Sequence, residues 1–461
     1  MFVKKLSINN YRLYKEKFQI IDFNIPNGEC GSGLNLIVGE NGCGKTTILD
    51  SISLCTLEYK ANLFNVSDFN TINENTIIEL EMDEQFEVKK TMSGSFMSKG
   101  FMFKSNIRKQ HSNNYLQSPV VFDQLYVSCD PENPKSSSPD LRISVNNPFS
   151  GKRFDELDLL YLDRNRLFQT KTGSFNDTKF DRLMGDFNTQ YIKKHKGNKI
   201  PDINSSIKKI LKDSAENKYL NRAITKFFEL SDHKIRLDFI NNYEPFKTAT
   251  FVLRDSEDIQ IPLSSIGTGY EMIFSLIYSY YLAKQNNKKI ILLIDEPELH
   301  LHPSIQKKFV DFLLEISSDS QVIITSHSPI LVKQLLYNDL VKTIVINRDK
   351  TVSEIKDFKL SYLSANEINY LAFGLATEEY HNELYEEINY KYYPNETSIK
   401  EFDKKFFITD KKGQKQYPWK GHQNEVSIHS YIRNQIHHRK DNGIPNYEDL
   451  KSSIEYMRTC L

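Results

Sequence analysis

The stretch Gly39–Thr47, which reads GENGCGKTT, constrains this chain more than any other part of its sequence. It fits the phosphate-binding pattern G-x-x-x-x-G-K-[ST] without a mismatch. The apolar run at residues 34–38 predicts a buried strand before it, and the apolar pattern at residues 48–52 predicts a helix after it. In such a strand, loop and helix, backbone N–H groups and the positive end of the helix dipole point at phosphate oxygens. We therefore interpret the stretch as a P-loop and not as a chance glycine-rich turn.

The residue types in the P-loop predict a role for each part of it. Lys45 is expected to reach the β and γ phosphates of a nucleotide, and the Thr46 hydroxyl is expected to ligate Mg²⁺. The loop residues predicted to bind the nucleotide are Gly39, Asn41, Gly42, Cys43, Gly44, Lys45, Thr46 and Thr47.

A second motif lies at residues 291–296, where four apolar residues precede two carboxylates. This is the pattern of a Walker B strand, and α/β sheets bind their ligands at the carboxyl ends of the strands. Asp295 is predicted to hold Mg²⁺ through water, and Glu296 is predicted to orient and deprotonate the attacking water. The alternative is an acidic strand end that caps the next helix.

The order of these patterns predicts an α/β fold with several parts. Residues 1–60 are expected to form the N-terminal part of a nucleotide-binding head, and residues 241–360, where strands and helices alternate, its C-terminal part. Residues 61–240 combine a period-two pattern with a Lys-rich helical one, which predicts a β-rich lid and a helical insertion. Residues 361–461 are expected to be mainly helical with one hairpin, and to bind a partner or carry an effector function.

The composition gives no sign of an exported or membrane-spanning protein. Lys+Arg and Asp+Glu each total 60, so the net charge is zero and any nucleic-acid surface must be a local patch. The five cysteines form no C-x-x-C pair, which fits a reducing compartment. No apolar run approaches the roughly 18 residues of a membrane span. A cytoplasmic protein without a membrane partner is therefore expected.

Three further segments, residues 263–268, 298–303 and 325–329, resemble motifs of ABC-type ATPases. The resemblance implies an ABC-type head that binds ATP and Mg²⁺, with two ATP molecules held between two copies of the head. It places His327 at the switch histidine of that family, which contacts the γ-phosphate and the attacking water; the alternative is a structural histidine at a strand end. Gln169 is the candidate for the family's Q-loop glutamine, and an ordinary surface glutamine is the alternative.

The signature motif of the family is the least regular of these matches. The resemblance aligns Ser265 with the signature serine and Gly267 with its second glycine, whereas Ile266 and Thr268 depart from the family pattern. In the family this motif closes over the γ-phosphate bound by the second copy, so Ser265 and Gly267 are expected to complete that site. A hydroxyl at the N-terminus of the following helix would also suit an anion. The alternative is that Ser265 is only an N-cap.

Residues 296–303 (EPELHLHP) and residues 6–12 (LSINNYR) resemble the RecF, SMC and OLD branch of AAA family ATPases. No heptad array of the SMC kind and no convincing TOPRIM pattern of the OLD kind is present. The chain therefore resembles the ATPase subunits of bacterial anti-phage systems, such as PtuA of Septu or the PARIS ATPase, whose nuclease is a separate polypeptide. This resemblance implies an ATP-hydrolysing subunit that dimerises head to head, or forms a higher oligomer, and controls a nuclease effector.

Two other functions stay open. A RecF-like repair ATPase would bind DNA directly. A self-contained ATPase with its own ribonuclease is suggested by Arg433, Asn434 and His438, which match the R-x4-6-H pattern of HEPN ribonucleases. On a helix, Arg433 shares a face with His437 at i,i+4, and His381 is a further candidate for the same cluster.

Direct contact with nucleic acid also stays open. Residues 404–420 interleave lysines with aromatic residues, including the single tryptophan, Trp419, and residues 193–199 form a basic run. Such segments can follow phosphates and stack on bases. The alternative is an exposed hairpin whose aromatic side chains belong to the core.

Overall fold

The structure is a computed structural model, and it describes residues 2–15, 19–56, 66–71, 76–83, 88–89, 95–96, 98–105, 120–126, 143–144, 157–162, 215–239, 249–254, 260–262, 268–285, 289–408, 416–419 and 422–461. The chain divides into two compact units. Unit 1 consists of Met1–Ile37, Gly42–Ser326 and Asn338–Val352. Unit 2 consists of Val38–Asn41, His327–Tyr337 and Ser353–Leu461.

A six-stranded sheet carries both nucleotide motifs, and we call it the P-loop sheet. Its strand order is β10-β14-β15-β3-β16-β17. The pairs β10–β14, β14–β15 and β15–β3 are parallel. The bounds are Leu157–Leu162 for β10, Lys289–Asp295 for β14, Gln321–Thr325 for β15, Leu34–Gly39 for β3, Lys342–Ile346 for β16 and Val352–Ser353 for β17. Strands β3 and β15 are buried along their whole length, as continuous apolar runs in parallel sheets usually are.

A second six-stranded sheet, the antiparallel sheet, has the order β2-β1-β4-β7-β8-β9. Its bounds are Val3–Asn9 for β1, Gln19–Asp22 for β2, Thr76–Met82 for β4, Ser98–Ser105 for β7, Val120–Tyr126 for β8 and Ile143–Ser144 for β9. Burial alternates along β1 from Lys5 to Asn9, because one face of the sheet packs on the core. The region expected to form a lid therefore contributes β4, β7, β8 and β9 to the sheet that the N-terminal strands begin.

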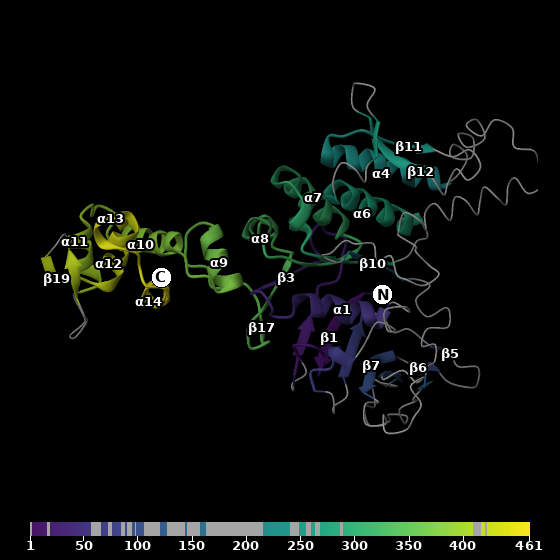
Figure 1. The fold of residues 1–461 in the computed structure, drawn as a ribbon, viewed down its shortest axis with the longest axis horizontal. Coiled ribbons are helices and arrows are strands. Elements are labelled where there is room, and N and C mark those ends of the chain that lie inside the picture. The colour runs from purple at the N-terminus through teal and green to yellow at the C-terminus, as the bar shows by residue number, and fades with distance from the viewer. Residues whose placement is uncertain are drawn as a thin grey trace, which may run out of the picture. The chain divides into compact units, whose positions relative to one another are not determined.

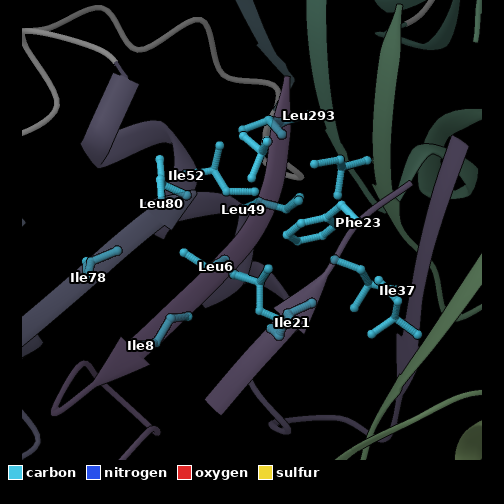
Figure 2. Close-up of a cluster of buried hydrophobic side chains, with 14 of the residues drawn as sticks. Leu6, Ile8, Ile21, Phe23, Ile37, Leu49, Ile52, Ile78, Leu80 and Leu293 are labelled. Atoms are coloured by element: carbon cyan, nitrogen blue, oxygen red, sulfur yellow. The ribbon is translucent and has the colours of Figure 1, made fainter. Parts of the chain in front are cut away.

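Helix α1, Lys45–Thr56, follows the P-loop and packs into the core of unit 1. Side chains from this helix and from both sheets meet in one apolar cluster (Figure 2). Leu49 and Ile52 of α1, Leu6 of β1 and Leu293 of β14 are all fully buried there. Each buried aliphatic side chain of this kind stabilises the fold by about 1.5–3 kcal/mol. The first turn of α1 is therefore anchored to a rigid core.

The rest of unit 1 is built on helices α4, α6 and α7 (Figure 1). Helix α4 packs against α6, with the rings of Phe227 and Phe274 edge to face at 5.6 Å. The bounds are Ala215–Ser231 for α4, Thr268–Gln285 for α6, Pro303–Ile316 for α7, Ile235–Phe239 for β11, Ala249–Arg254 for β12, Gln260–Pro262 for β13, Val88–Lys89 for β5, Ser95–Phe96 for β6, Val66–Asp68 for the 3₁₀ helix η2 and Pro297–His300 for η4.

Unit 2 is mainly helical and contains one hairpin, as the sequence predicts. Its bounds are Pro329–Leu336 for α8, Ala365–Phe373 for α9, Glu378–Tyr392 for α10, Ile399–Phe406 for α11, Tyr417–Trp419 for β18, His422–Val426 for β19, Ile428–His437 for α12, Arg439–Asn442 for α13 and Tyr447–Cys460 for α14. Tyr380, Phe402 and Ile454 lie at the centre of its own apolar core. Within the described ranges, each helix is too short or too polar to cross a lipid bilayer.

Candidate nucleotide site

The phosphate loop connects β3 to α1 through two glycines with positive φ angles, 73° at Gly42 and 104° at Gly44. A Cβ on Gly44 would lie 2.9 Å from the ring of Tyr14, whose hydroxyl donates to the Gly44 carbonyl at 3.3 Å. In the part of the chain that the structure describes, no acceptor takes the N–H groups of Cys43 and Gly44. Glycine thus permits a conformation in which these N–H groups can bind phosphate oxygens.

Lys45, the first residue of α1, lies in the same site as the two Walker B carboxylates. Its side chain is 5% exposed, and its ammonium nitrogen is 3.8 Å from the Cys43 sulfur. Burial lowers the pKa of Lys45, while the charges of Cys43, Glu296 and Asp295 act in the opposite direction. A largely buried cation beside phosphate-binding N–H groups is suited to hold the β and γ phosphates of a nucleotide.

Asp295, the last residue of β14, joins the phosphate loop to the neighbouring strand. The hydroxyl of Thr46 donates to Asp295 Oδ2 at 3.0 Å, and the hydroxyl of Thr325, the last residue of β15, donates to Oδ1. Asp295 and Thr325 are register partners in the parallel pair β14–β15. Burial raises the pKa of Asp295, and the hydrogen bonds from Thr325 and Thr46 oppose that rise.

The oxygen atoms of Thr46 and Asp295 fit a magnesium ion. Mg²⁺ prefers oxygen ligands and usually keeps several waters or substrate phosphate oxygens, so it needs few protein groups. Among the described residues, no group of three or more His, Cys, Asp or Glu side chains is placed to hold a metal. The donor set therefore suits Mg²⁺ that arrives with a nucleotide and does not suit a metal held by protein ligands alone.

Glu296 follows Asp295 in a conformation that the sequence does not reveal. Its φ and ψ angles, 47° and 62°, are left-handed, which costs a non-glycine residue about 1–2 kcal/mol. The Glu296 N–H is bound by the carbonyl of Thr325 at 3.2 Å and by its hydroxyl at 3.1 Å. The residue is 8% exposed. Strain held by surrounding hydrogen bonds is typical of functional sites.

The segment after β15 contributes to both units. In unit 1, Ser326 donates from its hydroxyl to Glu298 Oε1 at 2.9 Å and from its N–H to the Ile37 carbonyl at 3.1 Å. His327 follows directly and belongs to unit 2, where its ring stacks on Phe373 with the centroids 6.1 Å apart and an angle of 25°. Ser326 thus ties the turn after Walker B to β3, while His327 is held by the end of α9.

A charged network beside α1 is a part of the site that the motifs do not predict. Arg12 Nη1 lies 2.5 Å from Asp50 Oδ2, and Arg12 Nε lies 2.8 Å from Asp68 Oδ1. The hydroxyl of Tyr161 donates to Asp50 Oδ1 at 2.8 Å. The charge of Asp50 contributes to the raised pKa of Asp295, so the network borders the nucleotide site. Arg12 lies in the segment at residues 6–12, but no local pattern in that segment predicts these contacts.

Three residues predicted for the nucleotide site lie outside the described residues: Gln169, Ser265 and Gly267. The basic run at residues 193–199 also lies outside them. The helix predicted to follow the signature segment is present as α6, which begins at Thr268. The roles of these three residues stay predictions.

The candidate ribonuclease residues of unit 2 are only partly brought together. His437 and His438 are exposed at the end of α12. Partial burial lowers the pKa of His437, and the charges of Arg433 and His438 lower it further. His381 instead lies in the core, where its Nε2 is 2.9 Å from the Ser453 hydroxyl and burial lowers its pKa to about 3. The charge of Arg433 acts on both His437 and His381, but His381 is a neutral residue of the core.

The aromatic and basic segment starts as part of the core. Phe407 is fully buried, while Lys405 is exposed and pairs with Glu396 at 2.6 Å. Residues 409–415 lie outside the described ranges. At residues 404–407, the arrangement favours the alternative in which the aromatic side chains belong to the core.

Several known proteins are similar to this chain. It is 26% identical to OLD nuclease from Thermus scotoductus over 71% of its own length, and it spans 59% of the length of that protein. It is 23% identical to "Retron Vc95 probable ATPase" from Vibrio cholerae, covering 78% of this chain and 76% of the relative. It is 24% identical to Septu protein PtuA from Bacillus thuringiensis, covering 67% and 69%.

Among solved structures, the chain is similar to the SMC head bound to the C-winged helix domain of ScpA, with a TM-score of 0.41 and 15% identity over 77% of this chain and 96% of that one. The family profile described as "AAA ATPase domain" matches two overlapping stretches, residues 1–172 and 59–332. These stretches include the P-loop, the Walker B carboxylates and the strand before His327. The chain therefore belongs to the AAA ATPase domain family.

Proposed function

We propose that the chain binds ATP with Mg²⁺ and hydrolyses it to ADP and phosphate. The observation that carries this proposal is the hydrogen bond of 3.0 Å from Thr46 to Asp295, which joins the phosphate loop to the Walker B strand. Lys45 and the loop N–H groups bind the phosphates, and Thr46 and Asp295 hold Mg²⁺. When bound, Mg²⁺ neutralises charge that develops on the phosphate oxygens.

Glu296 is the general base of the proposed reaction. Its left-handed backbone and the two hydrogen bonds on its N–H fix the residue at the end of β14, next to the Mg²⁺ ligand Asp295. It accepts a proton from the attacking water. By analogy with the switch histidine of ABC-type heads, His327 contacts the γ-phosphate. By analogy with ABC-type heads, Ser265 and Gly267 of a second copy complete the site, so turnover requires a dimer of heads.

We further propose that the nucleotide state of the dimer controls a separate nuclease effector in an anti-phage defence system. The support is the similarity to Septu protein PtuA and to the retron ATPase, which extends over two thirds or more of each relative. Residues 361–461 form the proposed partner-binding region, because they lie outside the stretches that match the ATPase family.

The test compares Glu296→Gln with wild type. Loss of a general base lowers kcat by about 10²–10⁴-fold while the phosphate-binding groups remain. The variant is therefore expected to retain ATP through gel filtration and to run as a dimer in light scattering. Glu315→Gln, which removes an exposed carboxylate of α7, is the control and is expected to turn over ATP normally. A Glu296→Gln variant with wild-type turnover, or a wild type that neither binds nor hydrolyses ATP, contradicts the proposal.

One observation favours a second function, ribonuclease activity of the chain itself. Arg433 and the exposed His437 lie on α12, and the exposed His438 follows directly as its C-cap, so a cation and an imidazole are near each other at an accessible helix end. The purified chain should then cleave RNA, and His438→Ala should abolish cleavage without changing ATP turnover. Lys440→Ala, at an exposed lysine next to the same helix end, is the control. No cleavage by wild type excludes this function.

A further inference from the structure

The turn between β16 and β17 brings a second lysine to the phosphate loop. Lys350 Nζ donates to the carbonyl oxygen of Gly42 at 3.1 Å, although the two residues are 308 positions apart in the chain. Both residues belong to unit 1. Lys350 is not part of the P-loop pattern, and no motif in the sequence points to it.

The backbone of this turn gives no reason for a lysine. Lys350 has a φ angle of 68°, which costs a residue with a side chain about 1–2 kcal/mol relative to ordinary helical conformation and costs glycine almost nothing. The turn is closed by other residues: the Lys350 N–H donates to the Asn347 carbonyl at 3.0 Å, and the Asp349 carboxylate accepts from the Thr351 hydroxyl at 2.6 Å. Glycine would form the same turn without strain, so the side chain of Lys350 is the feature to explain.

The contact acts on a peptide that lies between two glycines of the loop. The Gly42 carbonyl and the Cys43 N–H belong to one planar trans peptide and point in opposite directions. Gly42 and Gly44, on either side of Cys43, have no Cβ and therefore restrain the backbone little, and both have positive φ angles. A cation bound to the Gly42 oxygen therefore fixes which way the Cys43 N–H points. In the described part of the chain, no acceptor takes that N–H.

We propose that Lys350 is a positioning residue of the nucleotide site, which orients the Gly42–Cys43 peptide so that its N–H faces a phosphate oxygen of ATP. The inference rests on the proposed function, because it takes the loop to bind ATP. Lys45 binds the phosphates directly, whereas Lys350 acts through the loop backbone. Its contribution is made in the bound ground state and therefore appears in affinity and not in kcat.

The test uses three substitutions of Lys350 and measures the dissociation constant of ATP with Mg²⁺ by calorimetry, the melting temperature by circular dichroism, and kcat. Lys350→Gly removes the strain, so it is expected to melt at or above the wild-type temperature, yet to bind ATP about fivefold to tenfold more weakly because a charged hydrogen bond is lost. Lys350→Met, of similar length, should show the same loss of affinity. Lys350→Arg should bind ATP with a dissociation constant within about twofold of wild type. In all three Lys350 variants, kcat should stay within about twofold of the wild-type value.

Lys308→Met, at a half-buried lysine of unit 1 that pairs with Asp232, is the control and should leave the affinity unchanged. ATP binding by Lys350→Gly or Lys350→Met as tight as that of wild type overturns the inference, and so does a loss in Lys350→Arg as large as in Lys350→Met. Either result leaves the proposed ATPase function intact if wild type binds and hydrolyses ATP. A wild type that binds no ATP contradicts both.

Discussion

At the scale of single residues, Thr325 is the hydrogen-bonding centre of the acidic site. Its hydroxyl donates to Asp295, and both its hydroxyl and its carbonyl accept from the N–H of Glu296. One threonine thus sets the orientation of the carboxylate proposed to hold Mg²⁺ and of the backbone of the proposed base. Groups that support catalytic residues in this way act through geometry, so their loss is expected to lower turnover more than affinity.

Thr325→Val tests this role. The substitution keeps the branched shape but removes the hydroxyl, which leaves Asp295 with one hydrogen bond fewer. We expect kcat to fall about tenfold, because one buried hydrogen bond to a charged group contributes about 1.5 kcal/mol or more. The dissociation constant of ATP without Mg²⁺ should change little. Thr343→Val, at a largely buried threonine of β16, is the matched control; equal effects of the two substitutions on turnover would contradict the role of Thr325.

At the scale of elements, the close packing of the β1–β2 turn against the P-loop makes a second prediction. In Gly44→Ala, the new Cβ would meet the Tyr14 ring at 2.9 Å while φ stays near 104°. We expect a loss of about 2–4 kcal/mol in the free energy of unfolding, from strain and overpacking together, and weak ATP binding. Gly28→Ala is the control, since its φ is 101° but nothing lies within 4 Å of the new Cβ. Urea titrations measure the free energy of unfolding, and calorimetry measures the affinity for ATP. Equal losses of both quantities in the two variants would show that the contact with Tyr14 does not matter.

The elements around the site could be predicted from the sequence to very different extents. Strands β3 and β14 and helix α1 were predictable because their apolar periods and the motifs that follow them are local. The left-handed backbone of Glu296 was not, because it depends on hydrogen bonds from the neighbouring strand. The contacts of Arg12 with Asp50, and of Lys350 with Gly42, join residues far apart in the sequence, and no local pattern signals such packing.

At the scale of the whole molecule, unit 2 should respond to pH through His381. Burial lowers its pKa to about 3, well below the ordinary value of about 6.5. The unfolded chain therefore binds a proton that the folded unit does not bind, so stability is full above pH 6.5 and falls as the pH drops towards 3. The loss between pH 7 and pH 5 is about 2 kcal/mol.

Trp419 is the single tryptophan of the chain and lies in β18, so its fluorescence reports the unfolding of unit 2. Urea titrations at pH 7 and pH 5 measure the loss. His381→Gln replaces the imidazole with an amide that can bond to the Ser453 hydroxyl but does not titrate. In this variant, the difference in unfolding free energy between the two pH values should shrink by most of that amount. A difference that stays the same would show that other groups cause the acid sensitivity.

The two units alternate along the chain, since unit 2 takes in residues 38–41 and 327–337 as well as 353–461. Within it, the end of α9 reaches two of these segments: Phe373 stacks on His327, and a Cβ on Gly374 would lie 2.9 Å from the carboxylate of Glu40. Residues 353–461 are consequently not a separable module. If recombination exchanged residues 353–461 between relatives, residues 38–41 and 327–337 would have to match the new segment. This requirement favours inheritance of the whole chain as one piece.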